Sequence, residues 1–154
     1  MSELKVGVVD VFVVDLRPEG WKILVLRRAA GTRCTGAWEV VHGRIEEGER
    51  AADAAAREVA EEAGVRLQRL YSITCHPFYL HHTDTVQVAV VFAAFADSDE
   101  EVILGDEHDV AEWVTVEQAQ ERLVWPRSRA SLTDIVALLG GGDAGPVEDV
   151  LRVW

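Results

Sequence analysis

Residues 43–65 read GRIEEGERAADAAAREVAEEAGV, and they set the character of the whole chain. The stretch holds seven carboxylates, and three of them, Glu58, Glu61 and Glu62, fall within five consecutive residues. On a helix, which turns about 100° per residue, these three side chains lie within an arc of about 100°. Like charges at this spacing repel one another. The arrangement is either a solvated acidic face or a half-shell of oxygen ligands for a hard cation such as Mg²⁺.

The helix that carries these carboxylates is predicted over residues 49–63. Ala52, Ala56, Val59 and Ala63 recur at helical spacing, so we expect them to form the face that packs on the core. The acidic arc is then expected to lie apart from that face. Gly64 follows where a helix C-cap glycine is typical.

The remaining pattern predicts strands before and after this helix and further helices near the end of the chain. Strands are expected at residues 6–16, 21–28, 38–43, 67–75 and 85–95, with a loop or a bent hairpin end at 76–84 and a short strand ending at 116. Helices are expected at residues 116–123 and 128–139. This order favours an α/β fold with a mixed sheet between layers of helices.

The last fifteen residues differ in composition from the rest. Residues 140–146 are rich in glycine and predict a flexible linker, so we expect a domain at 1–139 and a tail at 140–154. In the tail, apolar residues recur at helical spacing at Val147, Val150, Leu151 and Trp154. This stripe can dock on its own domain or on a second subunit; we favour its own domain, and both a monomer and a homodimer remain open.

The charge and cysteine content limit the possible partners. A net charge of -12 disfavours binding to the nucleic acid backbone, and a phosphate ligand would need a metal or a local basic patch. Cys34 and Cys75 are too few for a disulfide framework, so we expect free, partly buried thiols in the cytoplasm. The longest clean apolar run, residues 88–96, is far shorter than the ~20 residues needed to span a bilayer.

The acidic stretch also matches a known pattern at every fixed position. Glycine, five residues, glutamate, seven residues and then R-E-U-x-E-E-x-G-U, with U aliphatic, is the Nudix box. The matching residues are Gly43, Glu49, Arg57, Glu58, Val59, Glu61, Glu62, Gly64 and Val65. The chain therefore resembles the Nudix hydrolases, and the resemblance implies a Nudix-type α/β/α sandwich with a mixed central sheet.

The resemblance assigns roles to the residues of the box. Glu58, Glu61 and Glu62 correspond to metal-binding glutamates, and a carbonyl near Gly43 corresponds to a further ligand. Arg57 corresponds to the arginine that pairs with Glu49 and holds the carboxylates in register. Beyond the box, Glu107 corresponds to a glutamate that completes the metal site, with Glu112 as its competitor. The implied cofactor is Mg²⁺, with Mn²⁺ as a possible substitute.

Weaker similarity outside the box points to the substrate. The segments WEVVHGRIEEGE and EHDVAEW resemble a bacterial branch that hydrolyses dihydroneopterin triphosphate or dATP. His42 stands where many members have glycine, and its side chain can point into the phosphate site. Arg127 and Arg129 lie near the expected base or pterin position, or are simply solvated. The candidate substrate-binding residues are Arg27, Lys5, His42 and Trp125.

The expected reaction is Mg²⁺-dependent hydrolysis of a nucleoside or pterin triphosphate to a monophosphate and pyrophosphate. The catalytic candidates are Glu58, Glu61, Glu107 and Arg57, with Glu58 or Glu107 as the general base and Glu61 as a third choice. Two alternatives remain. One is a hydrolase of dinucleoside polyphosphates or ADP-ribose-type compounds, and the other is a non-catalytic module that senses a nucleotide.

Overall fold

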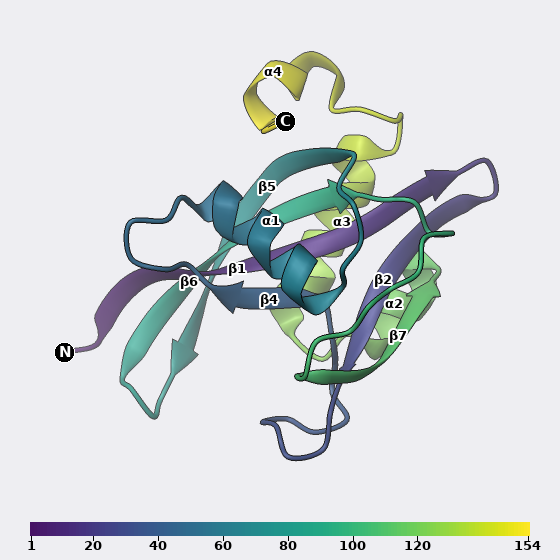
Figure 1. The fold of residues 1–154 in the computed structure, drawn as a ribbon. Helices are drawn as coiled ribbons and strands as arrows, with labels where there is room; N and C mark the ends of the chain where they lie inside the picture. The colour runs from purple at the N-terminus through teal and green to yellow at the C-terminus, as the bar shows by residue number, and fades with distance from the viewer.

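The computed structural model describes all 154 residues as a mixed β-sheet with helices on both faces (Figure 1). The strands are β1 (Glu3–Arg17), β2 (Gly20–Arg28), β3 (Trp38–Glu39), β4 (Val41–Arg44), β5 (Arg69–Leu80), β6 (Thr85–Phe95) and β7 (His108–Val114). The helices are α1 (Ala51–Glu62), α2 (Val116–Arg122), α3 (Pro126–Leu139), η1 (Gly145–Val147) and α4 (Glu148–Leu151). The predicted α/β architecture is confirmed.

Strand β1 organises the sheet, whose main path runs β3-β2-β1-β6-β5. It pairs in parallel with β6 along most of its length, and on its other side it has two antiparallel partners. Residues Val8–Val11 pair with β4, and residues Val14–Arg17 pair with β2. This division brings β4, with His42 and Gly43, beside α1.

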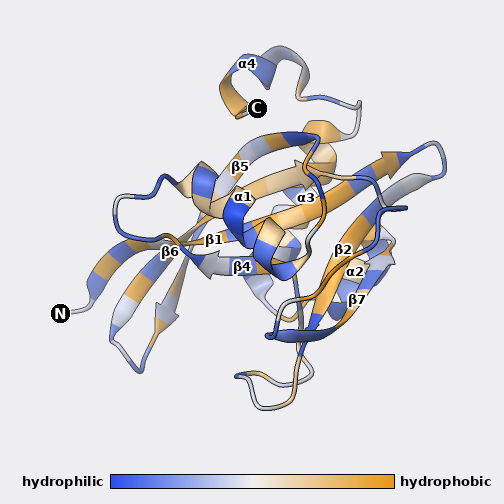
Figure 2. Cartoon of the chain, viewed as in Figure 1, coloured by the Kyte–Doolittle hydropathy of each residue, from blue (hydrophilic) through white to orange (hydrophobic).

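Two hydrophobic cores lie on the two faces of the sheet because side chains alternate along each strand. Val9, Val11 and Val13 of β1 face the core under α1. Phe12 and Val14 face the opposite core, which α2 and α3 cover. Figure 2 shows the resulting pattern, with apolar strands in the centre and hydrophilic residues on the outer turns of the helices.

Helix α1 presents a different face to the core from the one predicted. The buried residues are Ala54, Ala55, Glu58, Val59 and Glu62, with Ala63 buried just beyond the helix. At about 100° per residue, Glu62 falls near the middle of this buried arc, whereas Ala52 and Ala56 are only partly buried. The predicted stripe is confirmed at Val59 and Ala63, which are fully buried, but the buried arc is rotated away from Ala52 and Ala56 toward the glutamates. Two of the three clustered glutamates point inward.

The strand predictions differ from the structure in one place and are settled in another. The single strand expected at residues 38–43 is broken at Val40, because β3 pairs with β2 and β4 pairs with β1. Of the two alternatives for residues 76–84, the hairpin end is confirmed, because β5 stays paired with β6 as far as Leu80 and Thr85. Pro77 is tolerated there because β5 is an edge strand, where a missing N–H is left toward the outside.

The C-terminal segment lies against its own domain. The Val153 N–H donates to the Leu70 carbonyl, and the Leu70 N–H donates to the Trp154 carbonyl, both at 2.8 Å. Ala144 is buried in the core beneath α3, so residues 140–146 include an anchored position. Of the predicted apolar stripe, Leu151 packs against the core, whereas Val147, Val150 and Trp154 are exposed, so only part of the stripe makes the contact.

Cys34 and Cys75 are free thiols, as predicted, but both are exposed rather than partly buried. None of the helices has the length and apolar character required to cross a membrane.

Candidate active site

Arg57 ties the loop before α1 to the helix itself. Its Nε and Nη2 donate to the two carboxylate oxygens of Glu49 at 2.8 and 2.9 Å, and Nη2 also donates to the Arg44 carbonyl at 2.8 Å. Its Nη1 donates to Glu58 Oε1 at 2.8 Å. The Arg57 hydrogen bonds, with one from the Glu46 N–H, lower the pKa of Glu49 to about 2. The predicted Arg57–Glu49 pair is therefore present, and it also orients Glu58.

Gly43 is pressed against the carboxylate of Glu58. A Cβ at position 43 would lie 1.9 Å from Glu58 Cδ, so only glycine leaves room for the carboxylate here. Burial raises the pKa of Glu58, with Arg57 opposing and the charges of Glu61 and Glu107 adding to the rise. His42, just before it, is not among the residues with positive φ, so glycine is not required at that position.

Glu62 is the most deeply buried carboxylate of α1, at 5% exposure. Burial raises its pKa to about 9, although Oε2 accepts a hydrogen bond from the His42 N–H at 3.1 Å. The charges of Glu58, Glu107 and Glu39 raise this pKa further. Glu62 is therefore protonated at neutral pH unless a cation lies beside it.

Glu62, Glu107 and His108 form the group of potential metal ligands, with one atom from each lying within 4.8 Å of the others. Glu62 Oε1 and His108 Nδ1 are buried, lie 3.9 Å apart and have no hydrogen-bond partner. Two orphaned acceptors facing each other fit a divalent cation, which would satisfy both. The sequence reasoning missed His108, although its position next to Glu107 at the start of β7 was a usable signal.

His108 is held by a buried chain that we call the His108 chain, formed by Arg28, Glu39 and His108. His108 Nε2 and Arg28 Nη1 each lie 2.9 Å from Glu39 Oε1. Burial alone would raise the pKa of Glu39, but the hydrogen bonds from His108 and Arg28 outweigh it and lower the pKa. Glu39 pairs with Leu26, a residue of the core under α1, so this chain lies on the α1 face of the sheet.

A second chain, the His42 chain, is formed by Arg127, Asp10 and His42. His42 Nδ1 lies 2.7 Å from Asp10 Oδ1, and Arg127 Nε donates to Asp10 Oδ2 at 2.8 Å. Asp10 is 2% exposed, and its pKa is lowered because the His42 and Arg127 contacts outweigh the effect of burial. Asp10 alternates with Val9 and Val11 along β1, so it points to the face covered by α3.

The His42 chain ends against two aromatic rings. The Arg127 guanidinium lies 4.1 Å from the centre of the Phe78 ring and 5.5 Å from that of the Trp125 ring. Trp125 is the residue immediately before α3, and Pro126 begins the helix. Arg127 is thus bound through the Asp10 carboxylate and the aromatic faces, and the alternative of a simply solvated cation is wrong for this residue.

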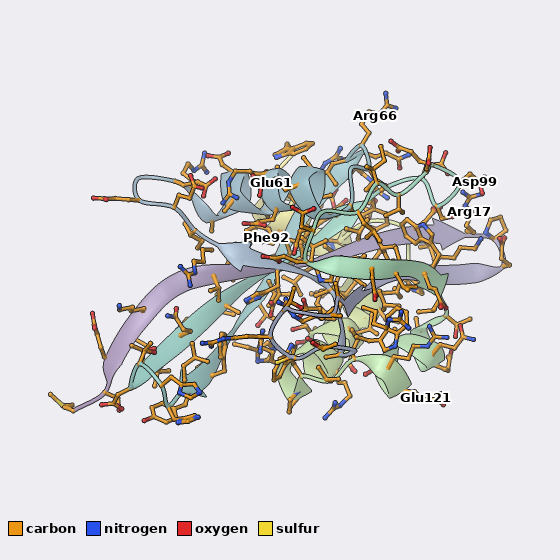
Figure 3. The ribbon with its side chains drawn as sticks, turned by 60° about the horizontal axis from the view of Figure 1, so that its bottom comes forward. Arg17, Glu61, Arg66, Phe92, Asp99 and Glu121 are labelled. Carbon is orange, nitrogen blue, oxygen red and sulfur yellow. The ribbon has the colours of Figure 1, made fainter.

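Other residues singled out from the sequence lie outside the Glu62 group. The side chain of Glu61 is 59% exposed, 3.4 Å from Arg57 Nη1, and Figure 3 shows it on α1 above the sheet residue Phe92. Arg27 pairs with Asp109 at 2.9 Å.

Three further candidates lie at the periphery. Glu112 pairs with Arg122 at 2.7 Å, so it does not replace Glu107 in the group. Lys5 is exposed near the start of β1, 3.8 Å from Glu3. Arg129 donates to the Leu123 carbonyl at 2.9 Å, which gives it a local structural partner.

The family of the chain follows from a comparison with protein-family models. The model described as NUDIX domain matches residues 6–135, which cover the whole sheet except the start of β1 and include every residue of the two chains. The chain belongs to the NUDIX family. Members of this family are pyrophosphohydrolases that typically use a divalent metal, and the chain is therefore assigned to this enzyme class.

Solved structures share the fold. A Nudix hydrolase of Listeria monocytogenes superposes with a TM-score of 0.74 at 21% identity, covering 96% of this chain and 98% of that one. The Ap4A hydrolase of C. elegans, in a binary complex, superposes with a TM-score of 0.71 at 20% identity, covering 89% and 98%. At these identities the likeness shows the fold and not the substrate.

One curated relative is a transferase and not a hydrolase. The octanoyltransferase of Myxococcus xanthus is 39% identical over 117 residues, which are 75% of this chain and 32% of that protein. The chain thus matches about a third of the length of this relative.

Proposed function

We propose that this NUDIX enzyme hydrolyses a nucleoside or pterin triphosphate to a monophosphate and pyrophosphate, with a divalent metal as cofactor. The observation that carries the proposal is the group of Glu62, Glu107 and His108, in which buried, unpaired atoms of Glu62 and His108 lie beside the exposed carboxylate of Glu107 and fit a cation. The net charge of -12 makes the cation necessary, because the surface itself repels a polyphosphate.

In this proposal Glu58, Glu62 and Glu107 hold the metal together with a carbonyl near Gly43, and Glu61 joins from the rim. The bound ion would neutralise charge on the phosphate oxygens and lower the pKa of a water molecule. Arg57 acts as a positioning residue, because it fixes Glu58 and the loop together. Glu58 or Glu107 takes the proton from the attacking water, with Glu61 as the third candidate.

The substrate's ring system is proposed to lie near the His42 chain. Trp125 and Phe78 flank the Arg127 guanidinium, and aromatic and guanidinium planes stack well on flat heterocycles. His42 is 30% exposed at its side chain and lies directly before Gly43, so its free ring nitrogen is available to a phosphate. Arg27 and Lys5 are proposed to meet the terminal phosphate, for which Arg27 would exchange its partner Asp109.

The proposed partner is a small phosphoanhydride, with no nucleic acid and no membrane, acting in the cytoplasm as a monomer or homodimer. Free Cys34 and Cys75 fit a reducing compartment.

The similarity to an octanoyltransferase favours one further candidate substrate. Acyl groups are commonly carried as thioesters of coenzyme A, which contains an adenosine-linked diphosphate of the kind a pyrophosphohydrolase cleaves. A reaction on coenzyme A or its acyl thioesters would link this domain to acyl transfer, and the 39% identity over 117 residues supports testing it.

The deciding experiment is a screen of phosphoanhydrides with Mg²⁺ and with Mn²⁺. The panel contains dNTPs, NTPs, dihydroneopterin triphosphate, dinucleoside polyphosphates, ADP-ribose and coenzyme A, with the products separated as monophosphate, pyrophosphate or phosphate. We expect cleavage of a triphosphate to monophosphate and pyrophosphate. Cleavage confined to dinucleotides, ADP-ribose or coenzyme A would overturn the substrate choice. Tight nucleotide binding without any cleavage would support the sensing module instead.

A further inference from the structure

We propose that His108 supplies a nitrogen ligand, through Nδ1, to the cation of this site, and that the site therefore prefers transition-metal ions such as Mn²⁺ to Mg²⁺. The inference rests on the metal dependence in the proposed function and goes beyond it, because the box supplies only oxygen ligands. It concerns which metal the protein selects.

The position of His108 Nδ1 is the first observation. The His108 side chain is 0% exposed, and Nδ1 has no hydrogen-bond partner although it lies 3.9 Å from Glu62 Oε1. That separation is too long for a hydrogen bond between the two atoms. Two ligands bound at about 2.1 Å to one ion lie about 3.0 Å apart in cis positions and about 4.2 Å apart in trans positions, so a small shift of either side chain brings both atoms within reach of one ion.

The chemical state of the ring is the second observation. An ionised Glu39 carboxylate can only accept, and Arg28 beside it favours the ionised state, so His108 Nε2 carries the proton that it donates to Glu39. In the neutral ring, Nδ1 then presents a lone pair toward Glu62. A histidine whose other nitrogen donates to a carboxylate is the arrangement by which proteins orient metal-binding imidazoles.

The third observation is that Nδ1 faces the acidic group and not the surface. Glu62 and Glu107 each offer an oxygen within 4.8 Å of it, and the buried atoms Glu62 Oε1 and His108 Nδ1 have no partner, a costly state that a cation between them would relieve. Mixed imidazole and carboxylate sites favour Mn²⁺, Co²⁺ or Zn²⁺, whereas Mg²⁺ prefers oxygen ligands and keeps several waters. The site therefore differs in selectivity from one made of glutamates alone.

The test uses the full chain loaded with Mn²⁺ alone and pulsed electron paramagnetic resonance. We expect modulation from one directly bound ¹⁴N nucleus, which disappears in His108→Gln. Glutamine is chosen because its amide N–H can keep the contact with Glu39 while leaving nothing at the Nδ1 position. His42→Asn, which removes the neighbouring imidazole, is the matched control and should keep the modulation.

Metal titrations give a second readout. The Mn²⁺ Kd of His108→Gln should rise at least about tenfold, while its Mg²⁺ Kd changes less than about threefold, since Mg²⁺ makes little use of nitrogen. Absence of nitrogen modulation in the wild-type protein overturns the inference even if the variant does not fold. Modulation that persists in His108→Gln and is lost in His42→Asn assigns the ligand to His42 and also overturns it.

These outcomes are separable from those of the proposed function. A protein that shows the His108 nitrogen but cleaves no phosphoanhydride would sink the proposed function and leave the inference standing. A protein that cleaves a triphosphate with only oxygen ligands on Mn²⁺ would do the reverse.

Discussion

Two arginine–carboxylate–histidine chains approach Glu62, one on each face of the sheet. The histidine and carboxylate of the His108 chain are buried, and the free ring nitrogen is left without a partner beside Glu62 Oε1. The His42 chain reaches Glu62 through the backbone, with the His42 N–H on Oε2, and its ring stays 30% exposed. The same three residue types are thus used in two ways. One chain leaves a buried ring nitrogen facing a glutamate, and the other presents a ring to the outside.

The largest effect should come from Glu62→Gln, which alters the point where the two chains meet. We expect hydrolysis to fall by on the order of 10²–10³-fold, as when one essential charged or donor group is removed from a catalytic site. The measurement is kcat/KM with Mn²⁺ on the best substrate of the screen. Activity within about threefold of wild type would place the metal elsewhere.

The same variant should also change how the stability of the metal-free protein depends on pH. In the metal-free protein the pKa of Glu62 is raised to about 9, from an ordinary 4.5. The unfolded chain therefore loses this proton first, and the wild type becomes less stable as pH rises from about 4.5 to 9. Glu62→Gln should lack this contribution to the decline, as urea titrations across that window would show.

The next largest effect is on the free energy of unfolding, and it tests the role of the His42 chain in stability independently of metal binding. Asp10→Ala leaves the Arg127 charge buried without its partner, and removal of one member of a buried pair costs about 3 kcal/mol. Asp10→Asn, which keeps the shape, should cost less than half of that. Both are read from urea unfolding, and a cost below about 1 kcal/mol for Asp10→Ala would mean that solvent compensates Arg127.

Glu39→Gln tests whether the His108 chain, and not the His42 chain, controls metal binding. The glutamine oxygen can still accept the His108 Nε2–H, but the negative charge that makes Nδ1 a more basic ligand is lost, so the Mn²⁺ Kd should rise by about tenfold. Asp10→Asn is the matched control and should leave the Mn²⁺ Kd unchanged. Equal losses in both variants, measured by calorimetric titration, would remove the functional distinction between the two chains.

The smallest effect concerns the Arg57–Glu49 ion pair, which joins the loop before α1 to the helix and lies outside both chains. The pKa of Glu49 is lowered to about 2 by Arg57, so its contribution to stability is complete above pH 4.5 and is lost as pH falls toward 2. Glu49→Gln should lower the unfolding midpoint by a few degrees at pH 7 and by progressively less below pH 4.5. A difference from wild type that stays constant down to pH 2 would contradict this account.

The sequence predicted the layers, the sheet and the box because these depend on local periodicity and fixed spacing. It did not predict which way α1 is rotated, since alanine and glutamate on this helix are both partly inward, and only packing against β1 and β4 decides between them. The sequence left residues 76–84 open between a loop and a hairpin end, because only the pairing of β5 with β6 in the assembled sheet decides between them.

The site shows the same division between local pattern and long-range contact. The glutamates of the box and the Arg57–Glu49 pair follow from the motif, but the two chains join residues far apart in the sequence. Asp10 and Arg127 are 117 residues apart, and Glu39 and His108 are 69 residues apart. In the sequence, Asp10 is a single acidic residue within an apolar strand, and His108 is simply the residue after Glu107. No spacing rule connects such residues before the sheet is assembled.

The close approach of Gly43 to Glu58 also suggests a practical tool. A methyl group at position 43 would overlap the end of a single mobile side chain, so Gly43→Ala should displace Glu58 while the strand pairing of β4 survives. Such a protein keeps all of its charges, including the net -12, unlike any glutamate-to-glutamine variant. Immobilised as bait, it would bind its natural small molecule from a cell extract without turning it over, and mass spectrometry of the eluate would then name the substrate directly.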